Sequence, residues 1–149
     1  MRFKENVYQQ FATLLEEKRN HLQQTLNELS NSAANETKST AGDKHETSLA
    51  MLQIEQENKR KQLSELILQQ GLFNKIDPSI TTPYVLNGSL VKTDKGYFFL
   101  SVALGKIIIA DKTIFALSPA APLGQKLMGH KAGDTVEMNG NKYKIESLE

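Results

Sequence analysis

Two long runs of helix-forming residues, joined by a short polar segment, constrain the fold of this chain more than any other feature. The first run, residues 3–31, contains neither Gly nor Pro, and the second covers residues 47–70. In the first run a large side chain recurs every seven positions, at Tyr8, Leu15, Leu22 and Leu29. In the second, the residues at alternating three- and four-residue steps are Leu49, Leu52, Gln56, Lys59, Leu63 and Leu66. Because such spacing gives each helix one stripe that must be covered, we expect the runs to pack as an antiparallel coiled-coil hairpin.

The polar segment between the runs, residues 30–42, is rich in small polar residues and is predicted to be the loop of the hairpin. Just beyond it, Asp43 and Glu46 place two carboxylates three positions apart at the far end of a thin rod. This is the spacing of a capping box, in which both side chains bond backbone N–H groups at the start of the second helix. The same spacing brings both carboxylates to one turn of a helix, where they can converge on one metal ion.

After Gly71 the pattern changes from helical to strand-like, and two prolines in residues 77–83 predict a linker. Turn signals then separate short runs that predict strands at residues 84–93, 97–104, 106–110, 113–117, 134–138 and 142–147, with one short helix at residues 122–128. Asn139 and Gly140 supply the positive φ angles that a tight hairpin requires. We therefore expect an α+β chain, with the helical hairpin in residues 1–76 and a small antiparallel β domain with one short helix in residues 77–149.

Composition narrows the classes of function. The chain of 149 residues has a formal net charge of +1 at pH 7, so its overall charge does not favour binding to a nucleic-acid backbone. It has no Cys and three scattered His residues, which excludes disulfides and argues against an intrinsic zinc site. The N-terminus lacks the pattern of a secretory signal, and no apolar run approaches the roughly 20 residues that span a bilayer. We expect a soluble, cytoplasmic protein without a membrane partner.

Two motifs, taken together in this order, resemble the Gre family of bacterial transcript cleavage factors. The segment from Gly42 to Glu46 is similar to that family's Gly-Asp-x-x-Glu tip. Residues 121–136 resemble its Ser-Pro-(apolar)-x-x-x-Leu-(apolar)-Gly-(basic) signature, followed by Gly-Asp and a strand. The resemblance covers nearly the whole chain, and it implies an N-terminal antiparallel coiled coil followed by a domain of FKBP-like fold.

The resemblance also implies a function. It implies a monomeric transcription elongation factor, of a group classed with DNA-binding proteins, that binds RNA polymerase and inserts its coiled coil into the secondary channel. There it would stimulate the polymerase's own cleavage of backtracked RNA, without being an enzyme alone and without an intrinsic cofactor. Asp43 and Glu46 would help hold a Mg²⁺ ion shared with the polymerase, and Lys44 and His45 would contact the polymerase or the nascent RNA 3′ end. Four residues of the second motif would dock on the polymerase: Pro122, Leu123, Lys126 and Gly129.

Departures from the family pattern keep other functions open. Residues 47–50 read Thr-Ser-Leu-Ala where the family commonly has Asn-Ala-Glu-Tyr, and Ala121 and Gln125 replace the usual Ser and Arg. A first alternative is a secondary-channel regulator that does not stimulate cleavage. A second is an FKBP-like peptidyl-prolyl isomerase, and a third is a coiled-coil adaptor without metal chemistry. An isomerase needs an aromatic pocket, for which the second half offers only Tyr84, Tyr97, Phe98, Phe99, Phe115 and Tyr143. Strand alternation predicts that one of Phe98 and Phe99 lies in the core and the other faces outward, on a docking surface.

Overall fold

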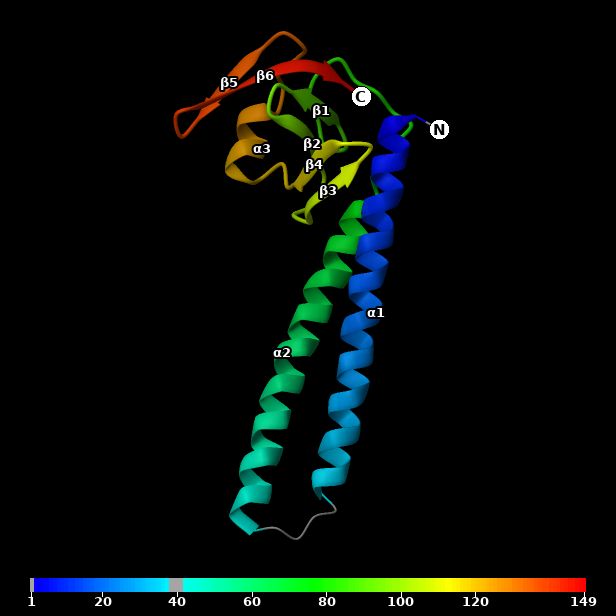
Figure 1. Ribbon diagram of the computed structural model, residues 1–149, viewed down its shortest axis with the longest axis vertical. Coiled ribbons are helices and arrows are strands. Elements are labelled where there is room, and N and C mark those ends of the chain that lie inside the picture. The colour runs from blue at the N-terminus through cyan, green and yellow to red at the C-terminus, as the bar shows by residue number, and fades with distance from the viewer. Residues whose placement is uncertain (1, 38–41) are drawn as a thin grey trace. The chain divides into compact units, whose positions relative to one another are not determined.

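The computed structural model describes residues 2–37 and 42–149, with side chains outside residues 36–46. Two long helices come first, α1 (Phe3–Thr37) and α2 (Gly42–Asn74), and a short helix, α3 (Pro122–Leu127), lies between the fourth and fifth strands (Figure 1). The strands are β1 (Leu90–Thr93), β2 (Gly96–Leu100), β3 (Gly105–Ile109), β4 (Lys112–Leu117), β5 (Thr135–Met138) and β6 (Asn141–Leu148). This order confirms the predicted α+β class, a helical hairpin followed by a small sheet with one short helix.

The chain divides into two compact units. Unit 2 is Leu14–Gln69, and unit 1 combines the chain up to Thr13 with Gln70–Glu149. The first turns of α1 and the last turn of α2 therefore belong to the same unit as the sheet. The predicted division into residues 1–76 and 77–149 stays a prediction about which part of the chain folds independently.

Unit 2 is a helical hairpin in which α1 and α2 run antiparallel (Figure 1). The predicted stripes form its seam, where Leu15, Leu26 and Leu66 are buried. The middle of the seam is polar, since Gln56 is buried and its side-chain amide donates to Ser30 Oγ at 3.4 Å. The leucine spacing thus identified the packing surface of both helices.

Both helices are longer than the sequence pattern predicted. Residues 30–37, predicted as part of the loop, continue α1 to Thr37, and α2 begins at Gly42. Ser, Asn and Thr are only slightly worse helix formers than Leu or Glu, and adding a residue to an existing helix avoids the cost of nucleation. At the other end α2 continues through Gly71 to Asn74. Phe73, which is fully buried in unit 1, provides the packing that makes this extension favourable.

The strands form one sheet in the order β3-β4-β2-β1-β6-β5. The predicted antiparallel arrangement is wrong for one pair, because β2 and β4 are parallel. A parallel pair cannot close through a tight turn, and here the antiparallel β3 provides the crossover between its two members. The predicted hairpin at Asn139-Gly140 is confirmed, with φ of 52° and 80° between β5 and β6. A second two-residue turn, Ala110-Asp111, has φ of 49° and 66° without any Gly to indicate it.

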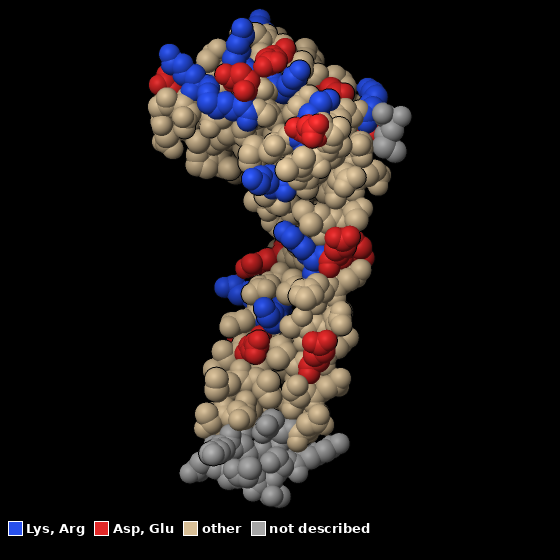
Figure 2. Space-filling model, in the orientation of Figure 1, with Lys and Arg blue, Asp and Glu red and all other residues tan. Residues whose placement is uncertain are grey.

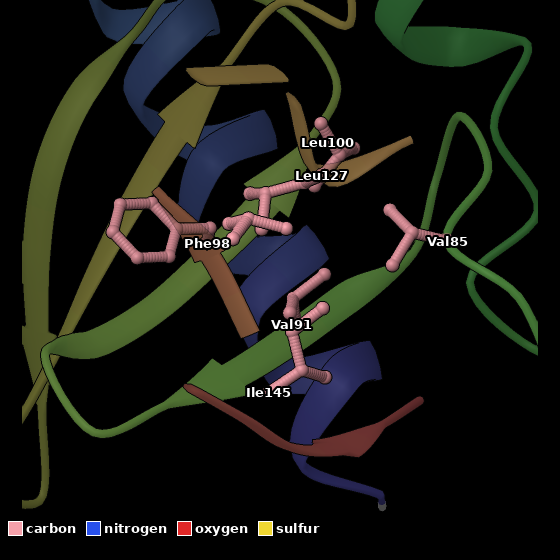
Figure 3. Close-up of a cluster of buried hydrophobic side chains, with 7 residues drawn as sticks. Val85, Val91, Phe98, Leu100, Leu127 and Ile145 are labelled. Carbon is pink, nitrogen blue, oxygen red and sulfur yellow. The ribbon is translucent and has the colours of Figure 1, made fainter. Parts of the chain in front are cut away.

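Both faces of β2 are covered in unit 1. One face holds Phe98 and Leu100 of β2 against Leu127 of α3 and Ile145 of β6, within a larger apolar cluster (Figure 3). On β2 the next ring, Phe99, belongs to the other face, where its centroid lies 6.2 Å from that of Phe11 and 6.1 Å from that of Phe73. The prediction that one of the two Phe rings faces outward is therefore wrong, because helix ends cover what a bare sheet would expose.

Two predicted strands are shorter than expected. The strand at residues 84–93 is reduced to β1, and the strand at residues 97–104 ends at Leu100. Before β1, Gly88 has a φ of 92°, which interrupts an extended chain. The backbone of Val85 bonds instead to the segment after α3, accepting from Gly129 N–H and donating to His130 C=O at 2.8 Å each. This partner is distant in sequence, so the run of apolar residues alone could not reveal it.

Candidate functional site

The acidic motif lies in the first turn of α2. Because the helix begins at Gly42, the backbone of Asp43, Lys44, His45 and Glu46 is helical. The side chains of these four residues lie outside the described part of the structure, so their roles as cap or metal ligands stay predictions. Because residues three apart are neighbours on a helix surface, a helical backbone at positions 43 and 46 is compatible with both carboxylates binding one metal ion.

The last described side chains of the hairpin indicate where this turn falls within unit 2. Ser32 and Asn35 of α1 face Ser48 and Met51 of α2 across a cavity of about 550 Å³. Since the helices are antiparallel, the last residue of α1, Thr37, and the first residue of α2, Gly42, belong to this end of the hairpin. The acidic motif lies in the first turn of α2 at this end, and its role there stays a prediction.

The four predicted docking residues occupy α3 and the turn after it. Pro122 is the first residue of α3 and is exposed, as are Lys126 in its last turn and Gly129 beyond it. Gly129 has a φ of 81°, which stops the helix as its sequence position suggested. Leu123 differs from the others, because it is half-buried and packs against the core cluster. Three of the four residues are thus available on the surface, and Leu123 anchors α3 to the sheet.

A fifth residue of this motif, Gly124, is structurally demanding and was not singled out by the sequence. It is buried within α3, and a Cβ at this position would overlap the carbonyl oxygen of Ser118 and lie 3.1 Å from two backbone atoms of Pro119. The helix can approach the β4–α3 connection this closely only if residue 124 has no side chain. A Gly inside a predicted helix is a weak signal of a special position, because Gly is a poor helix former, but it does not reveal the close approach to Ser118 and Pro119.

A small group of hydrogen bonds around Asp134 holds the segment that follows α3 in place. Asp134 Oδ2 accepts from the Lys131 backbone N–H at 3.0 Å and lies 3.1 Å from His130 Nδ1. These bonds, first the one from Lys131 and then the one with His130, hold the pKa of the Asp134 carboxyl below its usual range. The backbone of Asp134 continues the arrangement, because its C=O accepts from Ile145 N–H at 2.8 Å. The carboxylate therefore fixes the path of the chain between α3 and β5.

This cluster predicts an acid-sensitive contribution to the stability of unit 1. Because the native pKa of Asp134 is lowered, its contribution is complete above about pH 4 and is lost as the pH falls through the native pKa. The unfolding free energies of the wild type and of Asp134→Asn should therefore differ most at neutral pH, and the difference should shrink as the pH falls below about 4. Urea unfolding at a series of pH values measures this, with Glu137→Gln on β5 as a surface control. A difference that stays constant from pH 7 to pH 3 would contradict the role of the carboxylate.

Charged side chains are mixed on the surface rather than separated by sign. On the face of unit 1 seen in Figure 2, Lys and Arg side chains stand beside Asp and Glu. The exposed side chains of Lys92 and Glu146 in unit 1 form an ion pair, with 3.9 Å between Lys92 Nζ and Glu146 Oε2. Such pairs add little stability, and a mixed surface produces no strong field of one sign.

The described residues contain neither a metal-binding cluster nor a membrane-spanning helix. Among the side chains that the structure describes, no three His, Asp or Glu residues gather to hold a metal ion. Within the described chain, no helix combines the length and the apolar character needed to cross a bilayer. The side chains of the predicted metal ligands Asp43 and Glu46 lie outside the described part of the structure.

The aromatic residues that an isomerase pocket would need are largely engaged with one another. Within the core cluster, the ring of Phe98 stacks on that of Phe115, with 5.5 Å between the ring centroids. The same ring meets Tyr143 edge-on, with 5.7 Å between the centroids. The rings of Tyr97 and Phe3 of α1 also pack together, with 5.1 Å between their centroids. These rings pack against each other and fill space, so they do not favour the isomerase alternative.

The chain thus forms a helical hairpin and a small sheet with one short helix, and we compared this architecture and the sequence with known proteins. No protein-family model matches the chain, and no curated protein matches it. Among solved structures it is similar to the GreA factor homolog 1 (Gfh1) protein of Thermus thermophilus, with 14% identity over 93% of this chain and 94% of that chain and a TM-score of 0.37. A second structure, of the transcription factor Gfh1, has the same identity and TM-score and covers 92% of each chain. Likeness at this level carries no inference about function.

Proposed function

We propose that this protein is a Gre-type transcription elongation factor that binds RNA polymerase and stimulates cleavage of backtracked RNA. The observation that carries the proposal is the position of the Gly-Asp-x-x-Glu motif, which forms the first turn of α2 at the connection of an antiparallel hairpin. The hairpin suits insertion into the secondary channel of the polymerase, because α1 alone has 35 residues and is roughly 50 Å long. The factor acts in the cytoplasm as a monomer.

The residues of the motif suit a shared Mg²⁺ ion. Mg²⁺ prefers oxygen ligands and binds through one or two carboxylates, and Asp43 and Glu46 supply two on one helical turn. When bound at the polymerase active site, a second metal stabilises the attacking and leaving oxygens of the phosphodiester. In this proposal Asp43 and Glu46 hold that ion and orient the attacking water, while Lys44 and His45 contact the RNA 3′ end or the channel wall.

The factor has no nuclease activity of its own in this proposal. Two carboxylates at the end of a rod do not position a phosphodiester, and positioning is a large part of what a hydrolytic site must supply. The polymerase supplies the substrate and the first metal ion. Pro122, Lys126 and Gly129 of unit 1, exposed on and after α3, serve as contacts with the polymerase.

A transcript cleavage assay tests the proposal. Polymerase is stalled in a backtracked state on end-labelled RNA, and the protein is added at fixed Mg²⁺ concentration. We expect shortened 5′-labelled transcripts, released 3′ fragments and resumed elongation, with no cleavage of free RNA by the protein alone. Cleavage that does not rise when the protein is shown to be bound would contradict the proposal.

That outcome would favour the secondary-channel regulator, for which there is one specific observation. Residues 47–50 read Thr-Ser-Leu-Ala directly after the acidic pair, where the family has Asn-Ala-Glu-Tyr. These residues form the turn of α2 next to the motif, so the chemistry around the carboxylates differs from the family pattern. A regulator that occupies the channel without completing the metal site would still compete with substrate entry and change pausing.

A further inference from the structure

Unit 1 contains a cavity that the proposed function does not use. It has a volume of about 240 Å³ and lies among the first turn of α1, the segment that follows α2 and the turn before β1. Lys4, Lys75 and Asp77 line it, and its apolar wall consists of Ile76, Ile80 and Leu86. The cavity thus combines two cationic groups with a partly apolar wall, and Thr82, Asn87 and Ser89 also line it, so it can hold a small amphipathic ligand.

Lys4 is the distinctive residue of this cavity, because only 4% of its surface is exposed. Its ammonium group donates to the Ile80 carbonyl oxygen at 2.5 Å. An ammonium group has three N–H donors, so it can donate to a ligand as well. Burial lowers the pKa of Lys4, which shows that losing water is costly for its charged form. An anion beside Lys4 would offset that cost.

The charges around the cavity favour one negative charge on the ligand. Two lysines and one aspartate give the lining a formal charge of +1. Asp77 is engaged at one oxygen, since its Oδ1 accepts from the Ser79 backbone N–H at 2.9 Å and from the Ser79 hydroxyl at 2.5 Å. Arg2 and Glu149 are the other charges that act on Lys4, and they have opposite signs. A monoanion therefore balances the site, whereas a dianion such as phosphate leaves excess negative charge.

We propose that this cavity binds a small aliphatic monocarboxylate. The carboxylate lies between Lys4 and Lys75, and a short carbon chain packs against Ile76, Ile80 and Leu86. The volume is sufficient for a carboxylate with a chain of a few carbons, and the apolar wall favours such a chain over a fully hydrated anion. The site joins the first turn of α1 to the linker, so its occupation stabilises this part of unit 1.

Titration of the intact ¹⁵N-labelled chain with sodium butyrate tests the proposal. We expect saturable amide shifts confined to the residues around the cavity, and weaker or no shifts with butyramide, which keeps the shape but lacks the charge. Sodium phosphate at equal ionic strength should produce weaker shifts than butyrate. The assay contains no polymerase, so its outcome is independent of the proposed function.

Variants test whether Lys4 and Lys75 themselves bind butyrate, as opposed to any loss of positive charge weakening binding. Lys75→Met, at an exposed position, and Lys4→Met should each raise the apparent dissociation constant for butyrate about tenfold or more, as expected for loss of a charged hydrogen-bond partner. Lys106→Met on β3 is the matched control and should bind as the wild type does. Lys75→Met keeps the test valid if Lys4→Met fails to fold. Equal shifts with butyramide, stronger shifts with phosphate, no saturable shifts, or unchanged binding in Lys75→Met would each overturn the proposal.

Discussion

Replacing Asp43 by Asn, or Glu46 by Gln, is expected to abolish stimulated cleavage of backtracked RNA while leaving the hairpin folded. Asn is as good a helix cap as Asp, so a pure capping role predicts a cost of about 1 kcal/mol or less and normal behaviour with polymerase. If the two residues are metal ligands, the stability of the hairpin should barely change while stimulated cleavage is lost. Losing even a group that only supports a metal ligand reduces activity by about 10- to 100-fold, and losing the ligand itself should cost at least that much.

Three measurements make this result specific. Far-ultraviolet circular dichroism and urea unfolding check that the helices are unchanged, and a binding assay checks that the variants still occupy the polymerase. Raising the Mg²⁺ concentration should restore part of the cleavage, because a missing carboxylate weakens metal occupancy first. Glu57→Gln, which removes an exposed carboxylate from the same helix, should cleave as the wild type does. Variants at positions 43 and 46 that cleave normally would remove both residues from the mechanism.

The sequence predicted the hairpin because its signal is local and repeated. Each apolar step in residues 3–31 and 47–70 supports the next one, so the packing stripes were visible even though Gln56 interrupts the second run. The helix ends were less predictable, since residues 30–37 have neither a strong breaker nor an apolar stripe. Gly71 illustrates the same limit, because the packing of Phe73 in unit 1 keeps the helix going past a residue that often ends one.

The sheet was less predictable because its pairing is not local. The strands were found as runs, but the parallel neighbours β2 and β4 are separated in sequence by β3, and no residue in either run indicates their direction. Likewise, nothing near Phe99 indicates that Phe11 and Phe73 cover its ring. The stripe of α1 has two partners, α2 in unit 2 and the sheet in unit 1, and periodicity does not distinguish them.

For the candidate site, the sequence located the motifs but not the tertiary packing around them. The Asp-x-x-Glu spacing and the motif that contains Pro122, Lys126 and Gly129 could be read directly from the chain. The need for Gly at position 124 could not, because it arises from the approach of α3 to Ser118 and Pro119. The cavity at Lys4 was also hidden, since it joins two segments more than 70 positions apart, as the bond from Lys4 to Ile80 shows.

Gly124→Ala is therefore expected to be among the most destabilising single changes in unit 1. The new Cβ would overlap the backbone oxygen of Ser118, and neither the helix nor the Pro119 segment can yield without disturbing the core. We expect a loss of about 3 kcal/mol of unfolding free energy, at the upper end for overpacking. Gly71→Ala is the matched control. Gly71 is also helical but has open space around its Cβ position, so this change should stabilise the protein by about 0.5–1 kcal/mol.

The composition of the chain allows this effect to be assigned to one unit. There is no Trp, and all four Tyr residues, at positions 8, 84, 97 and 143, belong to unit 1. Tyrosine fluorescence therefore reports the unfolding of unit 1, whereas the helical circular dichroism signal comes mainly from α1 and α2. For Gly124→Ala we expect the fluorescence midpoint in urea to fall while most of the helical signal persists, and polymerase binding to weaken because α3 carries the proposed contacts. A variant whose fluorescence midpoint matches the wild type would show that the Ser118–Pro119 connection can move, and that the motif does not require Gly at this position.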